Sequence, residues 1–384
     1  MPVARNFRKV WRFVSIYGVR RTLFKVLGRI RPWWFRLPQR AHAADILMIG
    51  CGQFGFATIG YFIHKHFGNR FVACYDPDPR KQESFAGFYA VSRQHEDIRD
   101  LFDARNVRIV YIASNHASHT PYVLKALACG LDVYVEKPLS VNYAQLRELM
   151  TAVRSTEARI YAGYNRPFSS AIRDLRQVIS QFPQTPFSIN CFVSGHKIPP
   201  DHWYRDPAEG TRVCGNIGHW IDLMVHILSW RSLPRRFEVT AAYSNEEEPD
   251  DNVAITFVSE FGDITNIMLS SRCEPFEGIN EAIHLQYGDI IAKIDDFKHM
   301  VIWQSERKHT FSYWPKDVGH ERAILQPFEG GGWRDWKEVE HSTLLMLFVA
   351  GMVKRRERLA TFTFDDEWAK VASAVGGEES AILR

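Results

Sequence analysis

Residues 45–55 of the chain read DILMIGCGQFG, and residues 71–76 read FVACYD. An apolar run of strand length thus enters a G-x-G-x-x-G turn, and a second apolar run ends on an acid 21 positions after the last glycine. The segment between the two runs has the length of a helix. A strand, a glycine-rich turn, a helix and a strand that ends on an acid are together the fingerprint of a dinucleotide-binding unit.

Each glycine of this turn has a predicted role. Gly50 permits the tight turn, Gly52 lets a pyrophosphate lie against bare backbone, and Gly55 lets the following helix pack close to the strand. The amides and the dipole at the start of that helix would then face the phosphates. Gln53 and Phe54 lie in the same turn and are predicted to contact the cofactor.

The acid that ends the second strand is Asp76. Its carboxylate would accept hydrogen bonds from both hydroxyls of the adenosine ribose and would repel a 2′-phosphate, which favours NAD over NADP. Arg80, four residues later, would soften this preference, so NADP stays open. An ordinary strand–helix turn is the alternative, but it leaves the terminal acid unexplained.

The composition is that of a globular protein with about two domains. Of the 384 residues, 46% are hydrophobic and 24% are charged, which allows a sizeable core. The net charge of +4 is unevenly distributed, because the first 40 residues carry eleven Lys or Arg and no acid. The remaining residues carry 37 basic and 44 acidic side chains, a net charge of −7. This balance, without a recognition motif, argues against nucleic-acid binding.

The six cysteines, at positions 51, 74, 129, 191, 214 and 273, form no C-x-x-C pair and no metal-ligand spacing. Several lie in apolar runs, so reduced thiols in a cytoplasmic protein are expected. His116 and His119 have the spacing of a metal-binding pair, but no third ligand follows, and no metal is predicted. No apolar run approaches the roughly 20 residues that cross a bilayer, and the basic N-terminus lacks the apolar segment of a signal peptide.

Residues 1–44 are predicted to form a basic, amphipathic N-terminal extension. One face of a helix would carry Phe7, Val10, Trp11 and Val14, and another would carry Arg5, Arg8, Lys9 and Arg12. Such a helix is suited to lie peripherally on an anionic membrane or to contact an acidic partner. The alternative is a helix packed on its own protein with a solvated basic rim.

From residue 45 the sequence alternates strand-like and helix-like runs. Strands are predicted at 46–50, 71–75, 108–113, 131–135 and 159–163. Thr120 and Pro121 resemble the start of a helix, and Asn142 with Gln145 resembles a capping box. This alternation predicts an α/β Rossmann domain, with a doubly wound parallel sheet, over residues 45–165.

After residue 166 strand follows strand. Strand-like runs lie at 187–194, 237–244, 252–259, 263–271, 281–288, 290–296 and 299–304, and helix-like segments lie at 170–180, 210–230 and 334–375. Consecutive strands without intervening helices predict an open antiparallel sheet. Residues 166–384 are therefore expected to form an α+β domain for substrate binding and oligomerisation, with C-terminal helices.

Three further segments read ASNHASH at 113–119, VEKP at 135–138 and GNIGHWID at 215–222. Together with the fingerprint and with GYNR at 163–166, they resemble the Gfo/Idh/MocA oxidoreductase family, which includes glucose–fructose oxidoreductase and inositol dehydrogenase. The resemblance runs from about residue 45 to the C-terminal helices. The run PPDHW at 199–203 is similar to a branch associated with bacterial surface-polysaccharide and nucleotide-sugar metabolism.

The resemblance implies roles for the residues that match its motifs. Lys137 would stabilise an alkoxide-like oxygen while hydride leaves the carbinol carbon, and His219 would take the hydroxyl proton. The bond that precedes Pro138 is often cis in the family. Lys137 would also contact the cofactor, whose side would be completed by Ser114, Asn115, His119 and Glu136. The substrate side would be formed by Arg166, Asn216 and Asp222. His202 is a further candidate for substrate contact.

The sequence departs from the family at two points. Residues 114–116 read Ser-Asn-His where the family has Thr-Pro-Asn, so the backbone beside the nicotinamide is expected to differ. Position 215 is glycine where many members have aspartate, and position 216 is asparagine where the suspected branch often has an acid. An amide binds a sugar hydroxyl but does not relay a proton at neutral pH.

The leading hypothesis is an oxidoreductase that uses NAD, or NADP, and acts on a secondary alcohol of a sugar or nucleotide-sugar in surface-polysaccharide metabolism. One alternative is a cofactor-binding sensor or scaffold without turnover. Another is a family variant that recycles NAD while it cleaves a glycoside. By resemblance, a homodimer or homotetramer is expected.

Overall fold

The computed structural model describes residues 2–32, 34–38, 44–94, 98–102, 106–180, 184–245, 247–273, 275 and 278–374, without the side chains of residues 2–7, 93, 94 and 99. The chain forms two compact units. The parallel-sheet unit comprises Gly18–Gly163 and Glu321–Arg334, and the nine-stranded unit comprises residues 2–17 with Tyr164–His320 and Asp335–Ser373. The predicted boundaries at residues 44 and 165 stay a prediction.

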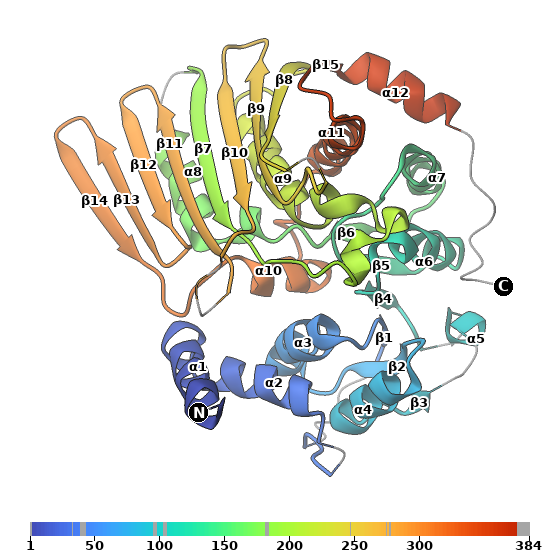
Figure 1. The fold of residues 1–384 in the computed structure, drawn as a ribbon. Coiled ribbons are helices and arrows are strands. Elements are labelled where there is room, and N and C mark those ends of the chain that lie inside the picture. The colour runs from blue at the N-terminus through green and yellow to red at the C-terminus, as the bar shows by residue number, and fades with distance from the viewer. Residues whose placement is uncertain are drawn as a thin grey trace. The chain divides into compact units, whose positions relative to one another are not determined.

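The parallel-sheet unit contains a six-stranded sheet in the order β3-β2-β1-β4-β5-β6, in which all neighbours are parallel (Figure 1). Its strands are β1 (Ile46–Ile49), β2 (Phe71–Tyr75), β3 (Arg93–Gln94), β4 (Ile109–Ile112), β5 (Asp132–Val135) and β6 (Ile160–Ala162). Strands β1 and β4 are buried along their whole length, which is why each reads as an unbroken apolar run. The Rossmann prediction is confirmed, and only the two-residue β3 lacked a predicted counterpart.

This unit also contains helices and short helical turns. They are α2 (Val19–Ile30), the π-helical turn η1 (Gly55–Ile59), α3 (Gly60–Phe67), α4 (Pro79–Tyr89), α5 (Ile98–Phe102), α6 (His116–Ala128), α7 (Tyr143–Arg154), α10 (His320–Leu325) and the 3-10 turn η6 (Gln326–Phe328). As predicted, Asn142 caps α7, because its side chain accepts a hydrogen bond from the backbone N–H of Gln145 at 2.9 Å.

The predicted start of α6 was wrong. The helix begins at His116, and Pro121 lies inside it. A proline removes the hydrogen bond to the carbonyl four residues earlier, which would normally destabilise a helix interior. Here that carbonyl, of Ala117, accepts a hydrogen bond from Nε2 of Gln145 at 2.9 Å instead. A side chain on α7 thus satisfies the group that the proline leaves open.

Residues 321–334 return to the parallel-sheet unit after the nine-stranded sheet is complete. The hydroxyl of Tyr111 donates to the carbonyl of Ile324 at 2.7 Å, and Nε2 of Gln326 donates to the carbonyl of Ala162 at 3.2 Å. One side chain of β4 and the backbone of β6 thereby hold this segment. It completes the aromatic and aliphatic core beneath the sheet.

The nine-stranded sheet has the order β14-β13-β12-β11-β7-β10-β9-β8-β15. Its strands are β7 (Phe187–Ser194), β8 (Arg236–Tyr243), β9 (Asn252–Ser259), β10 (Ile264–Ser270), β11 (Asn280–Tyr287), β12 (Ile290–Asp295), β13 (His299–Gln304), β14 (Arg307–Ser312) and β15 (Leu359–Thr363). All pairs are antiparallel except β7 with β10. The predicted antiparallel domain is confirmed, with β14 and β15 as unpredicted edge strands.

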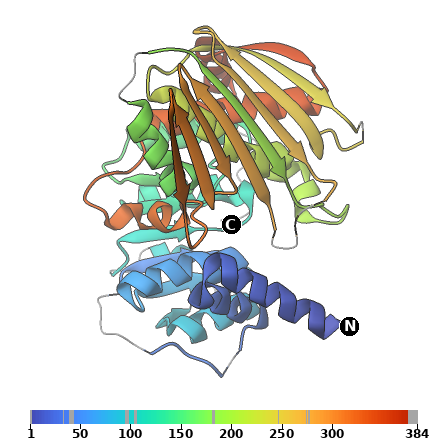
Figure 2. The same cartoon turned by 90° about the vertical axis from the view of Figure 1, so that its left-hand side faces the viewer.

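One face of this sheet is covered and the other is open. Buried and exposed residues alternate along β7 and β12, as expected of strands with one solvated face. Figure 2 shows the open face without helices. The helices and short turns of the unit are α1 (Pro2–Tyr17), η2 (Arg166–Phe168), α8 (Ser170–Ile179), η3 (Trp203–Arg205), η4 (Pro207–Glu209), η5 (Val213–Ile217), α9 (Gly218–Ser229), α11 (Trp336–Arg355) and α12 (Phe364–Ser373).

The basic N-terminal residues form two helices that pack on the protein. In α1, the carbonyls of Ser15 and Ile16 accept hydrogen bonds from the Trp314 indole and the Lys316 amide at 2.8 and 2.9 Å. In α2, the ring of Phe24 packs against aromatic rings of α3 and α4. The side chain of Phe7, predicted to share the apolar face of α1, lies outside the described residues. No helix in the described part of the chain is long and apolar enough to span a bilayer.

Candidate functional site

The three glycines of the glycine-rich turn have different surroundings. Gly50 has φ of +90°, and a Cβ there would lie 2.4 Å from the carbonyl of Ala113. A Cβ at Gly55 would lie 2.2 Å from the carbonyl oxygen of Gly50. Around the Cβ position of Gly52, in contrast, no atom lies within 4 Å. Packing therefore requires two of the glycines, and the third leaves an open backbone surface that fits a pyrophosphate.

The side chains of Gln53 and Phe54, which lie between Gly52 and Gly55, contact other parts of the parallel-sheet unit. Nε2 of Gln53 donates to the carbonyl of Lys25 on α2 at 3.1 Å. The ring of Phe54 packs against the hydrophobic core of the unit. A contact of either residue with a cofactor would therefore use mainly backbone atoms.

Asp76 lies where β2 ends and is bonded to the glycine-rich turn. Its Oδ2 accepts the backbone N–H of Cys51 at 2.8 Å, and its Oδ1 accepts the backbone N–H of Asp78 at 2.9 Å. The side chain is 8% exposed. Each carboxylate oxygen can accept a further hydrogen bond, so the group fits the two hydroxyls of a ribose.

His119 connects the turn after β4 to the turn after β5. Its Nδ1 lies 2.8 Å from the carbonyl oxygen of Pro138, and its Nε2 lies 3.2 Å from the carbonyl oxygen of Ser114. Burial lowers the pKa of His119 to about 4, which keeps the imidazole neutral at pH 7. A neutral ring donates one proton, and the shorter distance favours donation to Pro138. His119 is thus suited to hold the two turns together rather than to transfer protons.

Beside His119, the hydroxyl of Ser118 is hydrogen-bonded to Ser114 and Asn115, the two other residues of this turn that are predicted to contact the cofactor. It lies 2.6 Å from Oγ of Ser114 and 2.7 Å from Oδ1 of Asn115. The turn after β4 is therefore cross-linked by side chains although it lacks the family's proline. Asn115 itself is exposed, so its amide can still reach a bound molecule.

Glu136 and Lys137 follow β5. Burial raises the pKa of Glu136 to about 7, although the charge of Lys137 and a 2.8 Å hydrogen bond from the Tyr134 hydroxyl oppose this shift. The Lys137–Pro138 peptide bond is cis, as the resemblance implied. A Cβ at Gly163 would lie 2.8 Å from Cα of Glu136 and 2.9 Å from its Oε1. The glycine of the GYNR motif therefore makes room for this carboxyl group.

The substrate-side predictions fall in the nine-stranded unit, where Arg166 is held by an acid that the sequence did not indicate. Nε and Nη2 of Arg166 donate to the two carboxylate oxygens of Glu281 at 2.6 and 2.8 Å. The indole of Trp220 donates to the same carboxylate at 2.8 Å, and its ring lies beneath the guanidinium. These contacts tie η2, β11 and the first turn of α9 together. A substrate contact by Arg166 stays a prediction.

His219 and Asn216 lie at the junction of η5 and α9. The ring of His219 meets the edge of the Tyr164 ring at a centroid distance of 6.3 Å. Oδ1 of Asn216 is buried and has no hydrogen-bond partner among the described residues. A buried acceptor without a partner is costly, and a ligand donor would satisfy it. Asp222, one turn further on, is fully buried and accepts a hydrogen bond from the Ser342 hydroxyl at 2.9 Å.

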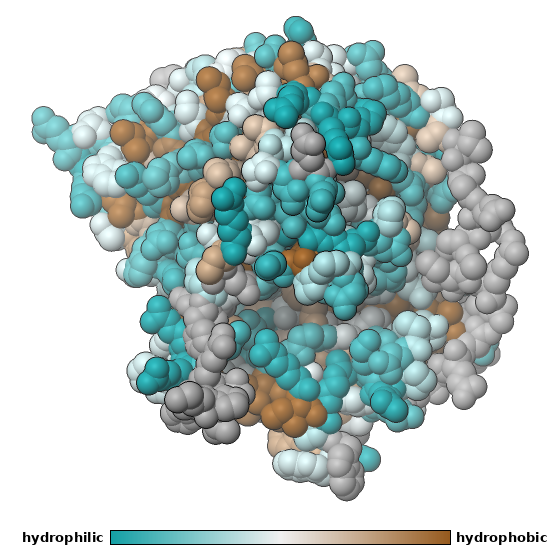
Figure 3. Space-filling view, in the orientation of Figure 1, coloured by the Kyte–Doolittle hydropathy of each residue, from teal (hydrophilic) through white to brown (hydrophobic). Residues whose placement is uncertain are grey.

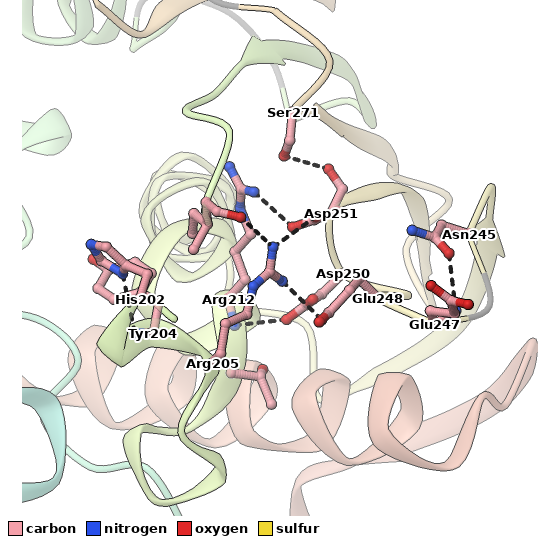
Figure 4. Close-up of polar contacts among 12 residues, drawn as sticks. His202, Tyr204, Arg205, Arg212, Asn245, Glu247, Glu248, Asp250, Asp251 and Ser271 are labelled. Atoms are coloured by element: carbon pink, nitrogen blue, oxygen red, sulfur yellow. Dashed lines mark hydrogen bonds and ion pairs between the residues drawn. The ribbon is translucent and has the colours of Figure 1, made fainter. Parts of the chain in front are cut away.

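His202 lies on a segment that an ion-pair network anchors (Figure 4). Its Nδ1 accepts the backbone N–H of Tyr204 at 3.2 Å. Behind it, Arg205 and Arg212 both donate to the carboxylate of Asp251 at 2.9 Å. The network fixes residues 196–212 to the loop before β9. Nothing in the local sequence pairs these residues, because the acids lie about 40 positions away from the arginines.

Metal binding finds no support among the residues described. No group of three or more His, Cys, Asp or Glu there could hold a metal ion. His116 and His119, with ring centroids 6.0 Å apart, lack a third ligand in this part of the chain. Four of the six cysteines are buried.

Most of the parallel-sheet unit matches a known protein family. Residues 44–164 match the profile of the family described as "Oxidoreductase family, NAD-binding Rossmann fold". This profile is that of the Gfo/Idh/MocA oxidoreductase family. The Gfo/Idh/MocA stretch covers the glycine-rich turn, Asp76, His119, Glu136 and Lys137.

Curated relatives match part of their length. The inositol 2-dehydrogenase of Ralstonia nicotianae is 28% identical over 192 residues, which are 48% of this chain and 53% of that protein. The trans-1,2-dihydrobenzene-1,2-diol dehydrogenase of Mus musculus is 34% identical over 110 residues, which are 29% of this chain and 33% of that protein. The chain thus spans about half the length, or less, of the curated Gfo/Idh/MocA relatives it matches.

Solved structures share the fold over most of the chain. GenD2 from gentamicin A biosynthesis, in complex with NAD, matches with a TM-score of 0.69 at 16% identity over 85% of this chain and 99% of that one. Levoglucosan dehydrogenase, in complex with NADH and levoglucosan, matches with a TM-score of 0.69 at 12% identity over 83% and 99%. At these low sequence identities, the structural similarity establishes the fold alone.

Proposed function

We propose that the protein is an NAD(P)-dependent oxidoreductase that acts on a secondary alcohol of a sugar or nucleotide-sugar. The observation that carries the proposal is the open backbone at Gly52, bonded through Cys51 to a buried carboxylate at the end of β2. This pair of features fits the pyrophosphate and the adenosine ribose of a dinucleotide. NAD and NADH are also present in the fold relatives described above.

The chain supplies two groups for the chemistry. Bound NAD(P) would supply a hydride acceptor. Lys137, at the end of β5, would stabilise the negative charge that develops on the substrate oxygen. His219, on the first turn of α9, would accept the hydroxyl proton, a role that suits an imidazole near neutral pH.

The substrate class is proposed from the polar groups of the nine-stranded unit. The buried Oδ1 of Asn216 needs a hydrogen-bond donor, and a sugar hydroxyl supplies one. Arg166, Asp222 and His202 remain candidates for the same substrate. The run at 199–203, on the anchored segment, supports a nucleotide-sugar of surface-polysaccharide metabolism as the physiological substrate.

The test has two stages. Calorimetry should show binding of NAD⁺ to the wild-type protein. A panel of inositol, UDP-sugars and GDP-sugars should then include one compound that reduces the bound nicotinamide. Lys137→Ala is expected to keep the affinity for NAD⁺ and to lower kcat by about 100-fold or more. Lys354→Ala, an exposed lysine on α11, is the control. Absence of NAD⁺ and NADP⁺ binding would refute the proposal.

A sensor or scaffold without turnover is the second candidate, and the amide at position 216 favours it. Asn216 cannot relay a proton, and position 215 is glycine. This candidate requires that Lys137→Ala leaves the cellular phenotype unchanged while the cofactor still binds. A lost phenotype with intact folding and binding would exclude it.

We further propose that the open face of the nine-stranded sheet forms a homo-oligomer interface. Phe192 on β7 lies beside Met268 on β10, and each is 42% exposed. Ile264 and Val258 are paired on the same face and are 49% and 38% exposed. Contiguous exposed apolar side chains on a bare sheet are typical of a protein interface.

We also propose that the protein acts in the cytoplasm and touches an anionic membrane through its N-terminal helices. Trp11 on α1 is 68% exposed, and Leu23 and Ile30 on α2 are 50% and 68% exposed. Figure 3 shows hydrophobic atoms gathered over α2. The first 40 residues add eleven cations and no acid, so apolar anchors and positive charge occur together.

A further inference from the structure

The helix α2, which precedes β1, is fixed against the helix that follows the glycine-rich turn. Arg21, which is 9% exposed, donates from Nη1 to the carbonyl of Ala57 and from Nη2 to Oγ1 of Thr58 at 3.0 Å. At Gly28, a Cβ would lie 3.1 Å from the Cβ of Ala57, so the two helices approach closely. The end of α2 is thereby held next to the dinucleotide fingerprint.

Arg31 is the C-cap of α2, and its side chain reaches the glycine-rich turn. Arg31 has a left-handed backbone with φ of 49°. Its Nη2 donates to the carbonyl of Cys51 at 2.6 Å, and its Nη1 donates to the carbonyl of Lys81 at 3.2 Å. The guanidinium lies 5.1 Å from the centre of the Phe56 ring. One arginine thus connects the turn after β1 to the first turn of α4.

Two acids surround the guanidinium at this corner. Asp76 accepts the N–H of Cys51, the residue whose carbonyl binds Arg31. Asp78, the N-cap of α4, also attracts the guanidinium electrostatically. The two hydrogen bonds of Arg31 go to carbonyls, which carry no net charge. The Arg31 guanidinium is therefore not hydrogen-bonded to an anion, and its positive charge would attract a dianionic group placed here.

We propose that Arg31 forms the 2′ subsite of the adenosine ribose, so that the protein binds NADP as well as NAD. This inference rests on the proposed function, because it concerns the same dinucleotide. Asp76 alone would exclude a 2′-phosphate by charge repulsion. The planar guanidinium of Arg31 presents paired donors that match phosphate oxygens and offsets the charge of the carboxylate.

The test measures binding rather than turnover. Calorimetry should give the Kd of NAD⁺ and of NADP⁺ for the wild type, Arg31→Ala, Arg31→Lys and Arg29→Ala. Arg31→Ala is expected to weaken NADP⁺ about tenfold or more, as the loss of a charged hydrogen bond implies, and NAD⁺ less than about threefold. The Kd of Arg31→Lys for NADP⁺ should lie between those of the wild type and Arg31→Ala. Arg29, an exposed arginine in the last turn of α2, should behave as the wild type.

The fragments 2′,5′-ADP and 5′-AMP isolate the 2′-phosphate and should repeat the same ratio. Equal weakening of both dinucleotides in Arg31→Ala, or an unchanged ratio, would overturn the inference and leave the proposed function intact. Failure of the wild type to bind either dinucleotide would overturn both. If Arg31→Ala does not fold, Arg31→Lys decides, because a wild-type ratio of the two Kd values in that variant would also overturn the inference.

Discussion

Arg166 and Glu281 form a bidentate ion pair inside the nine-stranded unit. Nε–Oε2 and Nη2–Oε1 distances are 2.6 and 2.8 Å, and the two side chains are 7% and 3% exposed. Trp220, next to His219, donates to the same carboxylate. The pair therefore supports the first turn of α9, on which the predicted general base lies.

Glu281→Ala is expected to lower the free energy of unfolding by about 3 kcal/mol or more, because it leaves the Arg166 charge buried and unpaired. Urea unfolding checks this value. The pair Arg235–Asp365, at 67% and 81% exposure, is the matched control, and Asp365→Ala should cost less than about 1 kcal/mol. Similar losses in the two variants would contradict the structural role of Glu281.

Gly52 and Gly55 should respond differently to alanine. Gly52→Ala meets no atom within 4 Å, so stability should change by less than about 1 kcal/mol while NAD⁺ affinity falls about tenfold or more. Gly55→Ala places Cβ 2.2 Å from the carbonyl of Gly50 and should lower the melting temperature strongly. Wild-type NAD⁺ affinity in a folded Gly52→Ala protein would argue against a phosphate at this backbone.

Glu136 should make stability depend on pH. Its pKa of about 7, raised by burial from 4.5, means that the folded state keeps a proton that the unfolded state has lost. The stabilisation is therefore greatest at low pH and is lost as pH rises from about 4.5 to 7, with a size of roughly 2–3 kcal/mol. Between pH 5 and pH 8, the free energy of unfolding of Glu136→Gln should therefore rise by this amount relative to that of the wild type.

The quantity to measure is the difference in the free energy of unfolding between Glu136→Gln and the wild type at each pH. The wild-type curve alone is insufficient, because His119 changes stability with pH in the opposite direction. Its pKa, lowered from 6.5 to about 4, gives a stabilisation that is present above pH 6.5 and is lost as pH falls towards 4. Both contributions overlap in the wild-type curve of stability against pH. Subtracting that curve from the Glu136→Gln curve leaves only the contribution of Glu136. Glu83→Gln, which changes an exposed carboxylate on α4, is the matched control. A flat curve for Glu136→Gln would contradict the prediction.

The open sheet face should control oligomerisation. Met268→Glu places a charge beside Phe192 and is expected to shift the protein towards monomer in light scattering after size-exclusion chromatography. Leu23→Glu, an equally polar change at an exposed position on α2, should leave the assembly unchanged. A wild-type protein that is monomeric at all concentrations would exclude an interface here.

The N-terminal helices should bind anionic vesicles. Wild-type protein is expected to sediment with phosphatidylglycerol-containing vesicles at low salt, and less with pure phosphatidylcholine. Trp11→Ser should weaken this binding about tenfold, since it removes a large apolar anchor. Leu359→Ser, an exposed position on β15, is the control. Sedimentation that depends equally on both residues would point to nonspecific binding.

The sequence by itself determined the two fold classes, most strand positions and the glycine-rich turn. These features rest on local patterns, because burial on one or two faces of a strand sets which neighbouring side chains are apolar. The strand β14 escaped prediction because it lacks such a pattern. β14 is exposed or half-exposed throughout, and so shows no apolar alternation.

Only the tertiary structure decided which distant groups meet. Glu281 lies opposite Arg166 although 115 positions separate them, and Arg31 reaches Cys51 because α2 packs on the helix after the turn. Pro121 stays inside α6 because a side chain of α7 takes over the open carbonyl. These pairings depend on how whole elements pack, and a single sequence carries no local signal for them. The glycine-rich turn could thus be read from the sequence, whereas the contact that Arg31 makes with this turn required the fold.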